Sequence, residues 1–292
     1  MAGQPFDDRD GWVWFNGEFV PHREAKVHVL SHALHYASCV FEGERCYDGQ
    51  IFKSREHSER LIQSGKLLGF EVPYSAEEIC KAKRELVVKQ GWKDCYLRAL
   101  AWRGSDEMGV SAQHGRINVA VTAWPWGDYF ADKMKGIRLM IAPWRRPAPD
   151  TAPSNSKAAG LYMICTLSRH AALDSGFDDA MMMDWRGQIA EGTGANIFFV
   201  KDGVLHTPLP DCFLNGLTRQ TVIGLAKARG IEVQERAIWP NELGTFSEVF
   251  LTGSAAEITP VREIAGMKFT PGKMTEQLIA DFSALVRRKN SA

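Results

Sequence analysis

A single lysine stands among small residues in the run Pro153-Ser154-Asn155-Ser156-Lys157-Ala158-Ala159-Gly160-Leu161-Tyr162. Small neighbours leave room for a flat ligand to approach the amine, and removal from water favours the neutral form of an amine. A neutral amine attacks an aldehyde and forms a Schiff base. The alternative is a solvated lysine at the start of a helix over 157–175, since lysine is rarely buried without a reason. The rest of the chain must decide between these two interpretations.

The composition is that of an ordinary globular chain. Of its 292 residues, 45% are hydrophobic and 24% are charged, and 35 Lys and Arg residues balance 35 Asp and Glu residues. A net charge of zero gives no reason to expect nucleic acid or an anionic membrane as a partner. No apolar run approaches the ~20 residues of a membrane span, and residues 1–10 lack the apolar core of a signal peptide. We therefore expect a cytoplasmic protein with one large domain or two moderate ones.

Neither the cysteines nor the histidines form a recognisable metal or disulfide motif. His28 and His32 are four residues apart, but no acidic partner or C-x-x-C accompanies them, so we expect structural histidines and no metal. The absence of any C-x-x-C pair in a chain of this length indicates reduced thiols in a cytoplasmic protein and no disulfide framework. The six cysteines are Cys39, Cys46, Cys80, Cys95, Cys165 and Cys212.

The first half of the chain alternates hairpins and helices. Asn16-Gly17 and Asp48-Gly49 are preferred two-residue hairpin turns between β-rich runs. A helix is expected over 55–68, and Ser75-Ala76-Glu77-Glu78 is a capping box that starts a second helix running to residue 90. This pattern predicts a small α+β domain over residues 1–124, which ends with two long β-rich runs, 95–102 and 117–124.

The second half is predicted to form a larger domain over residues 137–292. Residues 125–136 are interpreted as an interdomain loop, whose Trp126 and Tyr129 either plug a domain junction or wall a substrate pocket. Glu191 precedes two spaced glycines and an apolar strand. Such glycines permit a close backbone approach at which an acid could act, although the acid could equally be exposed in a turn.

Two segments of this half are candidate phosphate sites. Leu214-Asn215-Gly216-Leu217-Thr218 opens a helix that runs to residue 229, and the free amides at a helix N-terminus attract anions. The strand over 248–252 leads into Gly253-Ser254-Ala255-Ala256, which offers further amides and a hydroxyl. Each signal is weak alone because such tripeptides are common.

Taken in order, these pieces resemble one enzyme family. The likeness runs from about residue 12 to 265 and is carried by Trp14-Phe15-Asn16-Gly17, Ala25-Lys26-Val27-His28-Val29, Ser31-His32-Ala33-Leu34-His35-Tyr36, Val40-Phe41-Glu42-Gly43, Tyr96-Leu97-Arg98, Met108-Gly109-Val110, Pro125-Trp126-Gly127, Glu191-Gly192-Thr193-Gly194 and Thr252-Gly253-Ser254-Ala255-Ala256-Glu257-Ile258-Thr259-Pro260. The chain thus resembles the branched-chain amino acid aminotransferases, fold type IV enzymes that use pyridoxal 5′-phosphate. The resemblance implies a small N-terminal domain, a larger domain with a β-barrel-like core, and a homo-oligomer, either a dimer or a hexamer.

The resemblance also implies how the cofactor is held. Lys157 matches the Schiff-base lysine, which afterwards moves a proton as a base. Glu191 matches the acid that faces the pyridine nitrogen and keeps it protonated. Tyr162 matches the tyrosine bound to the phenolic oxygen, and Arg60 matches the phosphate-binding arginine. The remaining cofactor contacts fall on Gly194, Asn196, Leu217, Thr218, Ser254 and Ala255.

The substrate pocket follows from the same likeness. Arg98 matches the arginine that takes part in carboxylate recognition. The matching wall residues are Tyr36, Phe41, Met108, Val110, Trp126, Tyr129, Ala255 and Ala256. Apolar walls suit leucine, isoleucine and valine as amino donors to 2-oxoglutarate, which becomes L-glutamate.

One position departs from the family pattern. Many members have Glu-Gly-x-Gly-Glu-Asn, but Ala195 stands here in place of the second glutamate. This loss of a carboxylate leaves open a D-amino acid transaminase, an (R)-amine transaminase or an aminodeoxychorismate lyase of the same fold. Arg98 and Met108-Gly109-Val110 favour the branched-chain interpretation. A non-enzymatic metal-binding or interaction module using the histidines over 28–35 would leave Lys157 and Glu191 unexplained.

Overall fold

The computed structural model describes residues 4–127 and 133–288, which divide into two compact units. Unit 1 comprises Met1–Gly127 with Ser156–Gly160, and unit 2 comprises Asp128–Asn155 with Leu161–Ala292. The lysine segment therefore belongs to unit 1, although it follows the first strand of unit 2 along the chain. Within the described residues, no helix is both long and apolar enough to span a bilayer.

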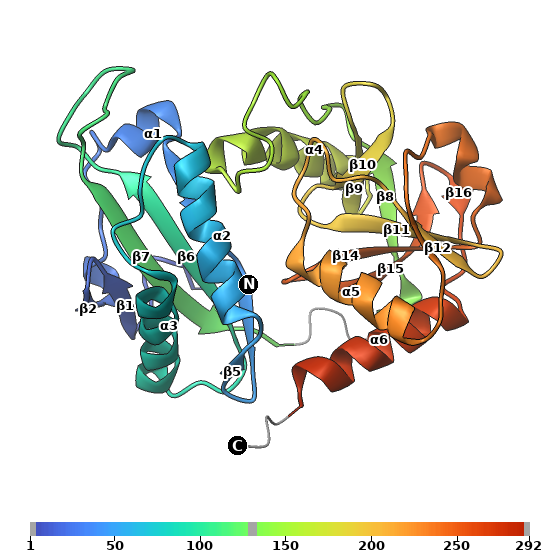
Figure 1. Cartoon of the computed structure of the whole chain (residues 1–292), viewed down its shortest axis with the longest axis horizontal. Helices are drawn as coiled ribbons and strands as arrows, with labels where there is room; N and C mark the ends of the chain where they lie inside the picture. Colours follow the sequence, from blue (N-terminus) through green and yellow to red (C-terminus); the bar gives the residue numbers. More distant parts are fainter. Residues whose placement is uncertain (1–3, 128–132, 289–292) are drawn as a thin grey trace. The chain divides into compact units, whose positions relative to one another are not determined.

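Unit 1 is an antiparallel sheet with helices α2 and α3 against one face (Figure 1). Among the described residues the strand order is β2-β1-β7-β6-β4-β5, and β3 also pairs with β6. Alternate side chains of β6 and β7 form the core beneath the two helices. The elements are β1 (Trp12–Phe15), β2 (Glu18–Pro21), η1 (His22–Glu24), α1 (His32–Tyr36), β3 (Cys39–Phe41), β4 (Glu44–Tyr47), β5 (Gln50–Ile51), α2 (Ser54–Leu67), α3 (Ala76–Gln90), β6 (Cys95–Arg103) and β7 (Ile117–Pro125).

The predicted local signals of this half are confirmed. Asn16 and Gly17 have φ values of 50° and 101°, as a two-residue hairpin turn requires. The side chain of Ser75 accepts a hydrogen bond from the Glu78 amide at 3.2 Å, and the Glu78 carboxylate accepts one from the Ser75 amide at 2.8 Å. Helix α3 then ends at Gly91, which adopts the left-handed conformation.

Unit 2 is built on a closed barrel, which confirms the predicted barrel-like core. Among the described residues, six strands run in the order β10-β9-β8-β15-β14-β11, and β10 pairs with β11 through Glu191 and Asn196 to close the ring. Leu139, Met181 and Ile197 are fully buried inside it. The strands are β8 (Ile137–Ile141), β9 (Asp179–Met183), β10 (Ile189–Gly192), β11 (Asn196–Lys201), β12 (Val204–Thr207), β13 (Val233–Glu235), β14 (Glu248–Gly253), β15 (Glu257–Ile264) and β16 (Met267–Lys268).

Helices pack against the strands of unit 2 (Figure 1). Helix α5 packs against β14 and α6, and α4 packs against β9. The helical elements of unit 2 are η2 (Lys133–Lys135), η3 (Ala159–Tyr162, which begins in unit 1), α4 (Met163–Asp174), α5 (Leu217–Ala228), η4 (Pro240–Thr245) and α6 (Lys273–Val286).

The helix predicted to start at Lys157 begins later than expected. Helix α4 starts at Met163, and a short 3-10 turn from Ala159 precedes it. Ala158 instead forms an antiparallel bridge with Val40 of β3. A bridge of this kind requires extended backbone, so it holds Lys157 outside the helix.

Candidate active site

The backbone of Lys157 is fixed by contacts within unit 1. Its amide donates a hydrogen bond to Ser64 Oγ at 3.0 Å, and its carbonyl accepts one from the amide of Phe41 at 3.2 Å. The hydroxyl of Ser156 donates to the carbonyl of Ser64 at 2.9 Å. Ser64 is a buried residue of α2, so one helix and one strand together set where the lysine side chain begins.

An aromatic ring joins Lys157 to the predicted substrate arginine. Lys157 Nζ lies 5.0 Å from the ring centroid of Phe41, and Arg98 Cζ lies 4.8 Å from the same centroid. Lys157 is half-buried, so the alternative of a fully solvated lysine does not hold. The structure therefore brings together the amine, the apolar wall and the cation that the sequence predicted for one site.

Arg98 has a buried hydrogen-bond donor that no protein acceptor satisfies among the described residues. Its guanidinium lies against Phe41, Tyr96 and Trp124, and within the described residues its Nε is buried without a hydrogen-bond partner. An unsatisfied buried donor costs free energy unless a ligand supplies an acceptor. A substrate carboxylate is the matching acceptor for a guanidinium.

The other wall residues of unit 1 lie beside this cation or at the surface. Trp126 packs on Tyr96, with ring centroids 5.1 Å apart. Tyr36, Met108 and Val110 are 44%, 48% and 84% exposed in the single chain. The remaining predicted wall residue, Tyr129, lies outside the described residues.

Two residues that support this site were not assigned a role from the sequence. Tyr96 stacks between Trp124 and Trp126, and its hydroxyl lies so close to Gly43 that a Cβ there would be 1.9 Å from it. His32 is buried in α1 and binds the carbonyl of Gly109 through Nε2 at 2.9 Å. This bond ties α1 to the loop that carries Met108 and Val110. His28 Nδ1 accepts from the amide of Leu30, and His35 Nε2 binds the carbonyl of Val29, so each of these three histidines has one ring nitrogen bonded to the backbone.

Arg60 of α2 is held by a buried carboxylate. Arg60 donates from Nε and Nη2 to the two oxygens of Glu42, at 2.6 Å and 2.8 Å. Burial raises the pKa of Glu42, but the charges and hydrogen bonds of Arg60 and His57 outweigh it and hold that pKa well below its usual range. The guanidinium predicted to bind phosphate is therefore held in a fixed orientation by a charged carboxylate.

In unit 2, Glu191 is flanked by a buried guanidinium. Arg146 Nε lies 3.4 Å from Glu191 Oε1, and the Arg146 side chain is only 4% exposed. Burial lowers the pKa of Arg146, but Glu191 and the other acidic groups around it together outweigh burial, so the net pKa is raised. An adjacent guanidinium in turn favours the charged form of a carboxylate. Sequence analysis missed Arg146, because a loop residue 45 positions away carries no local signal of this pairing.

Asn196 shapes the start of α5. Its Nδ2 donates to the carbonyl of Leu214 at 2.9 Å, and its Oδ1 accepts from the amide of Gly216 at 3.2 Å. Gly216 is the N-cap of α5, and the next amides belong to Leu217 and the buried Thr218. The first amides of a helix have no partner within it, so this terminus offers donors to an anion, and the phosphate site here stays a prediction.

Other predicted cofactor residues of unit 2 lie near the same end of the barrel. Asn196 pairs with Thr252, the residue two before Ser254, and a Cβ on Gly253 would touch the carbonyl of Gly194 at 3.4 Å. Ser254, Ala255 and Ala256 are half-buried in the turn between β14 and β15. Tyr162 ends η3 and packs against the buried cluster that contains Ala142, Cys165 and Met182.

Ala195 has an apolar role in this chain. It is 9% exposed and packs in the barrel core with Ile197 and Leu251. Ala195, which departs from the family pattern given by the sequence resemblance, therefore faces hydrocarbon here.

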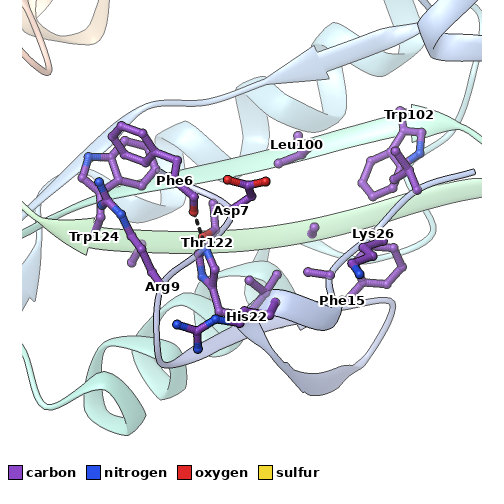
Figure 2. A pocket seen from close by; sticks show the side chains of 16 residues that line it. Phe6, Asp7, Arg9, Phe15, His22, Lys26, Leu100, Trp102, Thr122 and Trp124 are labelled. Atoms are coloured by element: carbon purple, nitrogen blue, oxygen red, sulfur yellow. Dashed lines mark hydrogen bonds between the residues drawn. The ribbon is translucent and has the colours of Figure 1, made fainter. Parts of the chain in front are cut away.

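A separate cavity of about 440 Å³ lies in unit 1 (Figure 2). It lies on the face of the sheet opposite to α2 and α3. Most of its lining strand residues alternate along the strands with the residues of the core beneath those helices. Phe6 packs edge-on against Trp124, Arg9 lies over Phe6, and His22 Nε2 binds the Phe6 carbonyl at 2.7 Å. None of the sequence-predicted site residues lines this cavity.

Comparison with known proteins agrees with this geometry. The amino-transferase class IV family matches residues 39–264. The branched-chain-amino-acid aminotransferase of Escherichia coli K12 is 42% identical over 270 residues, 90% of this chain and 87% of that protein. The structure of the Thermoproteus uzoniensis branched-chain aminotransferase with norvaline has a TM-score of 0.93 at 38% identity, covering 97% of both chains. That of the Thermobaculum terrenum enzyme in its PLP form has a TM-score of 0.87 at 30% identity, covering 96% of this chain and 95% of that one.

The family match over residues 39–264, together with the closed barrel and the lysine and arginine on one aromatic ring, identifies a class IV aminotransferase. The chain belongs to that family, and within it to the branched-chain amino acid aminotransferases.

Proposed function

We propose that this protein is a pyridoxal 5′-phosphate-dependent branched-chain amino acid aminotransferase. It transfers the amino group of L-leucine, L-isoleucine or L-valine to 2-oxoglutarate and releases the branched-chain 2-oxo acid and L-glutamate. The observation that carries the proposal is the Phe41 ring, which contacts both Lys157 Nζ and the guanidinium of Arg98. An apolar surface between an amine and a carboxylate-binding cation suits an α-amino acid with a hydrocarbon side chain.

The donor groups present fit pyridoxal 5′-phosphate. The chain offers an amine for the aldehyde, Arg60 and the N-terminus of α5 for the phosphate, and Glu191 for the pyridine nitrogen. The cofactor, when bound, supplies the electron sink that stabilises negative charge at the substrate α carbon. Each of its polar groups thus has a matching side chain or helix terminus in this sequence.

Each of these residues would have a separate role in the reaction. Lys157 Nζ would bind the aldehyde carbon and later carry a proton between the substrate α carbon and the cofactor. Glu191, with Arg146 beside it, would hold a proton on the pyridine nitrogen. Arg98 would orient the substrate carboxylate, and its orphaned Nε gives it a donor for this task. Alternation of donor and acceptor at one site gives ping-pong kinetics.

The same proposal includes a homo-oligomer in the cytoplasm. Tyr36, Met108 and Val110 are wall residues by resemblance, yet all three are more than two-fifths exposed in the single chain. This exposure would be explained by a second copy of the chain that covers these side chains or whose substrate site they help to line. All six cysteines, each within the described residues, are free thiols, as a reducing compartment favours.

A donor scan tests this function. Purified protein with the cofactor and 2-oxoglutarate would be offered L-leucine, D-alanine and (R)-1-phenylethylamine separately, and glutamate formation would be measured. Turnover with L-leucine alone supports the proposal. Turnover with D-alanine or the (R)-amine but not L-leucine would reject it and would mark Ala195 as part of a remodelled pocket.

A further inference from the structure

Glu42 is a buried acid that the proposed reaction does not use directly. It lies between β3 and β4, is fully buried, and its amide is bound to the carbonyl of Ala99 at 2.7 Å. Its carboxylate accepts three hydrogen bonds, two from Arg60 and one from His57 Nδ1 at 2.6 Å. His57 is itself 2% exposed. A charge buried this completely needs a reason, because desolvation of a carboxylate is costly.

We infer that Glu42, with His57, is a positioning residue that orients Arg60 for the cofactor phosphate. This inference rests on the proposed role of Arg60 as a phosphate ligand. Glu42 grips the Nε–Nη2 edge of the guanidinium in a bidentate pair, which fixes its plane as well as its position. His57 donates to the oxygen that also accepts from Nη2, so it limits how far the carboxylate can rotate.

Two effects of Glu42 oppose each other, and the geometry indicates which is larger. Its negative charge weakens the attraction between Arg60 and a phosphate. Against this, an arginine without such a partner loses most of its side-chain entropy when it binds a ligand. Glu42 already restricts the rotamers of Arg60 in the free protein, so this entropy is not lost in the binding step. Because the carboxylate is already neutralised by a bidentate contact, we expect orientation to dominate and its loss to weaken phosphate binding about tenfold.

A neighbouring buried pair provides a matched control. Glu44 is also fully buried, and it binds Lys83 Nζ of α3 at 2.7 Å. Lys83 also donates to the hydroxyl of Ser58 at 2.8 Å. Replacement of Glu44 by glutamine therefore breaks a buried ion pair in the same layer while the Glu42–Arg60 pair is kept.

The test compares binding of pyridoxal 5′-phosphate with binding of pyridoxal, which lacks the phosphate. Full-length protein freed of cofactor would be titrated with each compound by absorbance, and the ratio of the two dissociation constants isolates the phosphate contribution. Glu42→Asp keeps the charge but shortens the reach, so we expect it to lose about tenfold in this ratio. Glu44→Gln should lower thermal stability and leave the ratio unchanged.

A second pair of variants answers the case in which Glu42 variants fail to fold. His57→Leu removes the third hydrogen bond and should reduce the ratio, whereas His57→Asn keeps a donor near the Nδ1 position and should restore it. An unchanged ratio in both Glu42→Asp and His57→Leu, or an equal loss in Glu44→Gln, would overturn the inference. If Arg60→Lys itself leaves the ratio unchanged, the proposed phosphate role of Arg60 fails, and the positioning role of Glu42 fails with it.

Discussion

Replacement of Gly216 by alanine should disturb the anion site of unit 2 without touching Lys157. A Cβ at this position would lie 2.2 Å from Asn196 Oδ1, far inside van der Waals contact. Asn196 is 5% exposed and cannot move freely, because it holds both Leu214 and Gly216 by hydrogen bonds. The new methyl group must therefore displace either the asparagine or the first turn of α5.

The cost follows from the bonds that break. Loss of the two Asn196 hydrogen bonds amounts to roughly 2–3 kcal/mol, since each contributes about 1 kcal/mol and buried groups left unpaired cost more. In a chain of this size we expect the melting temperature to fall by roughly 3–5 °C. Affinity for pyridoxal 5′-phosphate should fall as well, because the free amides of α5 are displaced from their positions. Calorimetry and cofactor titration measure the two effects.

Two control variants make the result decisive. Gly224 lies within the same helix with open space around it, so Gly224→Ala should stabilise the protein by about 0.5–1 kcal/mol. In the double variant Asn196→Ala and Gly216→Ala, the clash partner is absent, so the two costs should not add. Additive costs, or a Gly216→Ala variant as stable as the parent, would refute the reasoning.

Three further predictions concern the proposed chemistry and the pH dependence of stability. Glu191→Gln should lower transamination about 100-fold or more, because it removes the partner of the pyridine proton; stopped-flow absorbance of the half-reaction checks this. The same change should lower the melting temperature, because the buried guanidinium of Arg146 loses its ion-pair partner. Arg98→Leu should raise KM for 2-oxoglutarate about tenfold or more, since a hydrogen bond to a charged group contributes about 1.5–3 kcal/mol. Hydrogen bonds from Arg138 and Lys268 lower the pKa of Glu263 to about 2, so its stabilisation is complete above the ordinary value of 4.5 and is lost as pH falls towards 2. Urea unfolding of Glu263→Gln should therefore show a smaller loss of stability than the parent over that window.

Local signals in the sequence predicted much of the fold, because turns and caps depend on neighbouring residues. The Asn16-Gly17 hairpin and the Ser75 capping box formed where expected. The start of the helix after Lys157 was misplaced, because the segment is held extended by Val40, more than 100 residues earlier. The residue pattern within the segment itself does not indicate a partner so distant in the sequence.

The same distinction between features visible in the sequence and contacts formed only on folding applies to the candidate site. Lys157, Arg60 and Glu191 were predicted because each matches a cofactor residue of the family that the chain resembles. Arg146 and the anchoring role of Glu42 were not predicted, since both depend on contacts made only after folding. The environment of Ala195 also required the structure, which places it in the barrel core beside Leu251.

The most direct test of the central claim is to locate the cofactor on the chain. Holoenzyme would be reduced with borohydride and digested, and mass spectrometry would identify the lysine that carries the reduced cofactor. We predict that the label lies on Lys157 alone and that Lys157→Ala abolishes both labelling and turnover with L-leucine. A label on another lysine, or full turnover in Lys157→Ala, would contradict the account.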